Sequence, residues 1–171
     1  NAHENQQYGP RFDGVVREIG DPLADGSIMS VPYRWTGAKN DFWDTGLTTM
    51  TDFSMTNGSE SSTLWASGQF VKSTGTTPGD KYNRASARVG GTRDLSDKFK
   101  VIYTAYYTQN RYDQTTETSN IYNYLLNAPG QAPITELKDW RNNPYANPNG
   151  YFNAYYNNPY FMADNHRKTT R

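Results

Sequence analysis

Four segments in the middle of the chain alternate apolar and polar residues with the period of two that is typical of β-strands. The alternation covers residues 47–55, 62–72, 84–92 and 99–108. The Asn57-Gly58 pair after the first segment and the polar run 94–98 before the last both suit tight turns. The pattern therefore predicts four antiparallel strands joined in sequence, which is an all-β, up-and-down arrangement.

The segments on either side of these strands show no sustained period. Gly, Pro, Asn and Asp recur at short intervals, as in ordered loops, and only Ile121, Tyr124 and Leu125 indicate a short helix. We therefore divide the chain into a first loop (1–46), four strands joined by turns (47–109) and a long, aromatic-rich loop that leads to the next strand (110–171).

Each predicted strand has one apolar and one more polar face. The polar set of the third strand contains Arg84, Ser86 and Arg88. Strands of about ten residues with this dyad pattern are typical of outer-membrane barrels, but a soluble β-sandwich also alternates, so the pattern leaves both folds open. The apolar set comprises Leu64, Ala66, Ala85, Ala87, Val89, Val101, Tyr103 and Ala105.

Composition narrows the function classes. Apolar residues make up only 35% of the chain, which is few for a conventional hydrophobic core, while aromatic residues reach 15%. Seventeen basic residues balance seventeen acidic ones, so no broad charge attracts nucleic acid. Cysteine is absent, which excludes disulfides and thiolate metal sites. The apolar runs are too short for a membrane helix, so a membrane location would require a closed sheet.

Candidate chemistry is sparse, and we expect no enzyme, no metal and no cofactor. His3 and His166 lie in different irregular segments without a partner at metal-binding spacing. Aromatic rings of the second long loop could stack against sugars or peptides, or only pack the loop; they are Trp140, Tyr145, Tyr151 and Tyr155. Loop aspartates could supply a carboxylate pair for glycoside hydrolysis, but such residues are mostly turn formers; they are Asp13, Asp21, Asp25, Asp41 and Asp44.

Several short motifs resemble one family in their order and spacing. Residues 7–14, QYGPRFDG, resemble the S-W-G-P-[KR]-x-D-G stretch of SusC/RagA-type TonB-dependent transporters, and residues 41–46, DFWDTG, resemble the F-F-x-T-G that follows it. Tyr82-Asn83-Arg84 and Asn158-Pro159-Tyr160 resemble later family motifs. The likeness covers nearly the whole chain, although Tyr8 stands where the family more often has tryptophan.

The resemblance implies a sector of an antiparallel, up-and-down transmembrane β-barrel with long extracellular loops, in the bacterial outer membrane. It implies import of glycan or peptide oligomers, with a SusD-like surface lipoprotein as lid and TonB as energy source. Arg84, Ser86 and Arg88 would face the lumen or the plug, and the apolar set would face outer-membrane lipid. The plug and the TonB-contacting segment are not among these residues, so we expect transport to need a longer protein. The alternative is a secreted carbohydrate-binding or adhesive β-sandwich.

Two structural expectations follow from this interpretation. Arginine at Val101 or Ala87 should cost about 2–4 kcal/mol near the membrane midplane, whereas arginine at Ser86 should be mild. The two long loops should lie on one rim of the barrel and pack together. Their contacts should come from Trp35, Phe42, Trp43, Trp140 and Tyr151.

Overall fold

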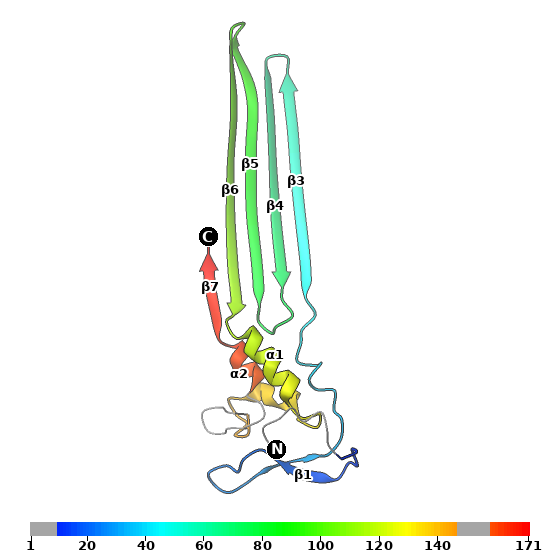
Figure 1. Ribbon diagram of the computed structural model, residues 1–171. Helices are drawn as coiled ribbons and strands as arrows, with labels where there is room; N and C mark the ends of the chain where they lie inside the picture. The colour runs from blue at the N-terminus through cyan, green and yellow to red at the C-terminus, as the bar shows by residue number, and fades with distance from the viewer. Residues whose placement is uncertain (1–9, 147–157) are drawn as a thin grey trace. The chain divides into compact units, whose positions relative to one another are not determined.

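A computed structural model describes residues 10–146 and 158–171 of the chain (Figure 1). The elements are β1 (Val16–Ile19), β2 (Met29–Pro32), β3 (Leu47–Ser59), β4 (Ser62–Thr74), β5 (Lys81–Ser96), β6 (Phe99–Thr115), α1 (Thr118–Asn127), the 3-10 helix η1 (Ile134–Asp139), α2 (Pro159–Ala163) and β7 (His166–Thr170). Most of the ordered structure is antiparallel sheet, as the alternation predicts. Among the described residues, no helix is long and apolar enough to cross a membrane.

The chain forms two compact units, which we describe separately. The sheet unit comprises residues 46–75, 80–114 and 167–171. The loop unit comprises, among the described residues, 10–45, 76–79, 115–146 and 158–166.

The sheet unit is a meander in which each strand pairs with the next, in the order β3-β4-β5-β6-β7 (Figure 1). All four predicted strands are present, and they are longer than the alternation indicated, with β6 continuing to Thr115. The sheet is open, and its outer strands are β3 and β7. Because β7 is much shorter than β6, most of the β6 edge that precedes Asn110 has no neighbouring strand among the described residues.

The first turn differs from the sequence expectation. Asn57 and Gly58 do not form it, because they pair with Leu64 and Thr63 inside the β3–β4 ladder. The connection is Glu60-Ser61, and among the described residues no residue other than glycine has a positive φ, so the turn is not of the Asn-Gly type. The longer ladder adds backbone pairs that a turn at Asn57 would forfeit. The second turn is also narrower than predicted, at residues 97–98, after a β-bulge between residues 94 and 96.

The strand registers define two faces of the sheet, because side chains alternate across a strand and paired residues share a face. Phe53, Gly68, Ala87 and Tyr107 form one row across β3 to β6. All eight residues of the predicted apolar set lie on the face of this row, which we call the apolar face; this prediction is confirmed. The opposite, polar face carries Arg84, Ser86 and Arg88, the residues with which the apolar set alternates along β5.

Glycines let aromatic rings lie flat along this sheet. Gly68 is the cross-strand partner of Phe53, and Gly90 is the partner of Trp65. A Cβ atom on Gly90 would lie 2.6 Å from the Trp65 ring, and one on Gly68 would overlap the Phe53 ring. Aromatic rings folded over glycine recover packing that a glycine in a strand otherwise loses.

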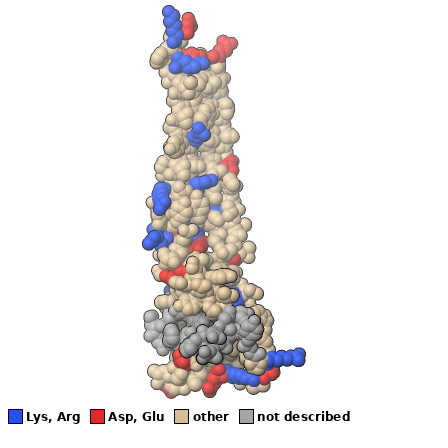
Figure 2. Space-filling view, in the orientation of Figure 1, with Lys and Arg blue, Asp and Glu red and all other residues tan. Residues whose placement is uncertain are grey.

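The apolar face is bare in this structure. Phe53 is 64% exposed, Met55 53% and Tyr107 61%. On this face, no charged residue lies between Asn83 and Gly91 of β5 or between Val101 and Gln109 of β6. Figure 2 shows a cluster of charged side chains at the end of the sheet that carries the two short turns, and further separate charged side chains along its length. The sheet therefore has an uncharged apolar band with charge at its limit.

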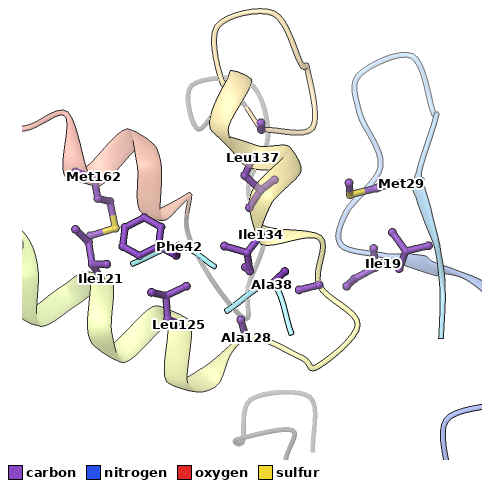
Figure 3. Close-up of a cluster of buried hydrophobic side chains, with 14 residues drawn as sticks. Ile19, Met29, Ala38, Phe42, Ile121, Leu125, Ala128, Ile134, Leu137 and Met162 are labelled. Carbon is purple, nitrogen blue, oxygen red and sulfur yellow. The ribbon is translucent and has the colours of Figure 1, made fainter. Parts of the chain in front are cut away.

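The loop unit has a hydrophobic core built from two segments that are distant in the sequence (Figure 3). Ile19 and Phe42 come from the first segment, and Ile121, Leu125 and Ile134 come from the second. Ile121 and Leu125 are one helical turn apart on α1, which is why that face of the helix is buried. The predicted packing of the two long segments against each other is confirmed.

Two features of the loop unit depart from the sequence expectations. The first long segment is not wholly irregular, because β1 and β2 form an antiparallel hairpin that buries Ile19, Met29 and Val31. Four-residue strands are too short for alternation to reveal them. Trp43 and Trp140 pack on the core as predicted, whereas Trp35 makes its predicted contact with the second segment at Gly130 but stays 57% exposed and outside the core. Tyr151 lies outside the described residues.

Asn158 fixes the start of α2 from inside the core. Its buried side chain donates to the carbonyl oxygens of Leu137 and Ala146, at 2.8 and 2.7 Å, and accepts from the backbone N–H groups of Tyr160 and Phe161. Pro159 follows at the first helical position, which suits its fixed φ.

We expect Asn158→Ala to destabilise the loop unit by about 1–3 kcal/mol, because it leaves two buried carbonyl groups unpaired and removes the helix cap. Hydrogen exchange of the α2 and η1 amides in the full-length protein measures this loss. Asn142→Ala is the matched control, because that side chain donates to the exposed carboxylate of Asp139 and has no other hydrogen bond among the described residues. Equal exchange in the two variants would contradict the role of Asn158.

Candidate functional site

The polar face of the sheet unit brings together the charged residues that the sequence singled out on β5. Arg84, Ser86 and Arg88 follow one another at every second position on this face. Neighbouring strands add Asp52 and Gln69, which are paired with each other and with Ser86 in one row. The register therefore places one carboxylate and two guanidinium groups on the same surface.

A hydrogen-bonded chain crosses three strands on this face. The Gln69 side-chain amide donates to the carboxylate of Asp52 at 2.6 Å, and its carbonyl oxygen accepts from the guanidinium of Arg84. The Gln69 amide lies between the two charged groups and is hydrogen-bonded to both. Asp52 is therefore the negative charge that faces Arg84, across one amide group. The Nε of Arg84 is buried and has no hydrogen-bond partner among the described residues.

Arg88 is held differently, by stacking. Its guanidinium carbon lies 5.0 Å from the centroid of the Trp65 ring, within the range of a cation–π interaction. Trp65 in turn lies over Gly90, where any larger residue would displace the ring. Glycine, tryptophan and arginine therefore form a three-layer stack that fixes the height and direction of the Arg88 side chain above the sheet.

The stack borders a shallow depression of about 650 Å³. Hydroxyl groups from each of β3 to β6 reach its lining, namely those of Ser54, Ser67, Ser86, Tyr106 and Thr108, together with Arg88, Asp52 and Gln69. Arg88 makes no ion pair with any residue that the structure describes, although guanidinium groups commonly bind a carboxylate through two parallel hydrogen bonds. The surface is rich in hydrogen-bonding groups and carries one uncompensated cation.

The aromatic candidates of the second long loop are held by local contacts. The guanidinium of Arg141 lies 4.0 Å above the Trp140 ring, and Phe161 meets that ring edge-on at a centroid distance of 5.0 Å. The indole N–H donates to Asp164 at 3.3 Å. Tyr145 packs against the core of the loop unit. Tyr151 and Tyr155 lie outside the described residues.

Sequence reasoning missed an exposed aromatic group in the loop unit. Trp35 and Phe12 both rest against Gly130, where an added Cβ would lie 2.7 Å from the first ring and 3.1 Å from the second. Phe12 also contacts Tyr33 at a centroid distance of 4.9 Å, and the Arg17 guanidinium lies 4.5 Å from the Tyr33 centroid. Only the register of distant segments creates this group, so no local pattern could indicate it.

The loop aspartates with described partners act in turns and local ion pairs. Asp13 accepts two hydrogen bonds from Arg17, at 2.8 and 2.7 Å, and one from the Val15 N–H. These bonds, the Arg17 pair first, lower the pKa of Asp13 to about 2. Asp25 accepts from the N–H and hydroxyl of Ser27, which lowers the pKa of Asp25 as well. The turn-forming interpretation is confirmed for these two residues.

Asp44 and Asp41 act on Tyr160, whose pKa is raised by burial and then by their negative charges.

Among the described residues, no group of three or more histidine or acidic side chains could hold a metal ion. His166 begins β7, and His3 lies outside the described residues. The polar face is therefore the strongest candidate site in the described part of the chain. Comparisons with models of known protein families and with curated proteins give no match for this chain.

Proposed function

We propose that this chain is a sector of the wall of a bacterial outer-membrane β-barrel, in a SusC/RagA-like, TonB-dependent importer of glycan or peptide oligomers. The observation that carries the proposal is the contrast between the two sheet faces. One face is apolar and bare, with Phe53, Met55 and Tyr107 more than half exposed. The other carries Arg84, Arg88 and a row of hydroxyl groups, together with exposed Met50, Ile102 and Tyr106, so the faces differ in charge and hydrogen-bonding groups and not in exposure. Lipid outside and a polar lumen inside suit that contrast.

The dimensions of the apolar band support the same proposal. The rows without charge on either strand run from Ala85 to Gly91 on β5 and from Tyr103 to Gln109 on β6, because arginine lies in the next row at each end. A strand that crosses the bilayer at a tilt needs about 9–11 residues, which these spans approach. Tyr103 and Tyr107 within the band are 44% and 61% exposed, so their rings would be available to contact lipid.

The edges of the sheet also favour a larger closed structure. β3 has thirteen residues and no outer neighbour among the described residues, and both of its faces are exposed. Long, flat and apolar edges promote aggregation, and soluble proteins avoid them with short strands, bulges or covering segments. Further strands on β3 and along the unpaired part of β6 would remove both edges, as barrel closure does.

The connections support an orientation for the proposed barrel. The two-residue turns at 60–61 and 97–98 would be periplasmic, because short turns are typical of that side. The longer connection 75–80 and the loop unit would be extracellular. In this arrangement a SusD-like lipoprotein would cover the extracellular side, and TonB would act through a plug supplied by the longer protein.

Fractionation of cells that produce the full-length protein tests the proposal. We expect the protein to stay with the outer membrane after washing with alkali or urea, and to be released by detergent, because the apolar band would be in contact with lipid. The folded protein should also migrate differently from the boiled protein in a denaturing gel, as closed barrels resist detergent. A secreted β-sandwich, which would bury the apolar face against a second sheet, would instead be recovered as a stable soluble monomer, and that result would reject the barrel.

A further inference from the structure

Among the residues that the structure describes, Arg88 is the one charged group on the middle of the polar face for which no oppositely charged partner is present. Asp52 and Arg84 compensate each other through the amide of Gln69. At the strand ends, Lys100 pairs with Asp94 at 3.3 Å on this same face. Arg88 contacts the Trp65 ring, which attracts the cation but accepts no conventional hydrogen bond. Its five N–H donors therefore remain available toward the depression.

The surroundings of Arg88 are suited to an oxygen anion of low charge. Hydroxyl groups of Ser54, Ser67 and Ser86 lie around the same depression and can donate to further oxygens. The guanidinium is planar by resonance, and its contact with Trp65 restricts its orientation, which favours two parallel hydrogen bonds to a carboxylate. The nearby carboxylate of Asp52 would oppose a doubly charged group such as phosphate more strongly than a single carboxylate.

We infer that the polar face binds a carboxylate group at Arg88, with Trp65 as the positioning residue beneath the guanidinium. The inference rests on the proposed function to the extent that the polar face lines a lumen. The carboxylate has two possible sources, an acidic residue elsewhere in the same protein or an acidic sugar or peptide that passes through. The chemistry recognised is the same in both cases, and two measurements on the purified full-length protein distinguish the sources.

The first measurement concerns an internal carboxylate. Thermal unfolding of the full-length protein is compared for wild type, Arg88→Gln and the control Arg93→Gln, whose side chain lies on the apolar face near the turn. An internal partner predicts that Arg88→Gln alone lowers Tm at neutral pH, and that the difference disappears below about pH 4, where carboxylates protonate. The comparison is made in an Asp52→Asn background, because Asp52 lines the same depression and its attraction to Arg88 would be lost with Arg88 and would also disappear below about pH 4.

The second measurement concerns a carboxylate from solution. Binding of glucuronate and binding of glucose are measured separately at constant ionic strength. Each affinity is determined for wild type and for Arg88→Gln. An external ligand predicts binding of glucuronate but not glucose, and about 10- to 100-fold weaker binding by Arg88→Gln, the loss expected for hydrogen bonds to a charged group. Trp65→Leu should weaken binding in the same direction, because the guanidinium loses its fixed orientation.

The two sources and the failure of the inference give different results. Two results together overturn the inference. The first is that wild type does not bind glucuronate more tightly than glucose. The second is that the Tm of Arg88→Gln equals that of Arg93→Gln, or lies below that of wild type by the same amount at every pH. A pH-independent loss would mean that Arg88 only packs on Trp65. The cell fractionation described above is independent of both measurements, so a soluble protein would reject the barrel without deciding whether Arg88 binds a carboxylate.

Discussion

Arginine in place of Ala87 is expected to abolish most membrane insertion of the full-length protein. Ala87 lies at the centre of the uncharged band of β5, in the row that also contains Phe53, Gly68 and Tyr107. A guanidinium there would face the middle of the bilayer at a cost of about 2–4 kcal/mol, or roughly 30- to 1000-fold in the folding equilibrium. Refolding into phospholipid vesicles, followed by the shift in gel mobility on boiling, measures the folded fraction.

Ser86→Arg is the matched control for this substitution. Ser86 is the preceding residue on the same strand, and its side chain lies on the polar face, where hydroxyl and guanidinium groups already occur. We expect it to insert nearly as well as the wild type. Equal loss in Ala87→Arg and Ser86→Arg would show that the two faces do not meet different solvents, and the barrel assignment would be wrong.

The register changes the expectation for Val101. Sequence alternation treats Val101 and Ala87 alike, but Val101 pairs with Arg93 across the ladder, so a charge already lies beside it on the same face. This row is next to the second short turn, at the limit of the band. Because the cost of a charge falls to about 0–1 kcal/mol near the interface, we now expect Val101→Arg to be mild.

Faces of long strands could be predicted from the sequence because the side-chain period is two and needs no knowledge of neighbours. Leu64, Val89 and Tyr103 were placed together on this basis, and the register confirms it. The turn could not be located in the same way. Asn57-Gly58 has the composition of a turn, but three further backbone pairs in the β3–β4 ladder outweigh that local preference.

The candidate site shows the same limit. The sequence indicated that Arg84, Ser86 and Arg88 share a face, which follows from alternation within one strand. It could not indicate the Gln69 bridge or the stack on Trp65, because these depend on which residues of β4 are paired with β5. Contacts that are distant in sequence also decide which aromatic rings are covered, so Trp35 and Trp140 could not be told apart.

Alanine in place of Phe42 should unfold the loop unit locally while the sheet unit stays intact. Phe42 is 1% exposed and contacts Trp43 and Tyr160 at ring-centroid distances of 5.0 and 4.9 Å. It lies in the core that joins the first and second long segments (Figure 3). A buried phenylalanine replaced by alanine typically costs about 3–5 kcal/mol, because transfer free energy is lost and a cavity remains.

Hydrogen exchange of the full-length protein measures this loss, and α1 and η1 are the elements to follow. Their protection should fall by roughly 150- to 5000-fold, up to complete loss where the unit is less stable than the substitution costs, whereas the amides of β4 and β5 should keep theirs. Tyr122→Ala is the control, since that aromatic side chain lies on α1 of the same unit but is 59% exposed. If both variants exchange alike, or if β4 and β5 lose protection together with α1, then Phe42 does not hold a separate core. Loss of protection in β4 and β5 together with α1 would mean that the loop unit has no stability of its own and that the chain unfolds as one.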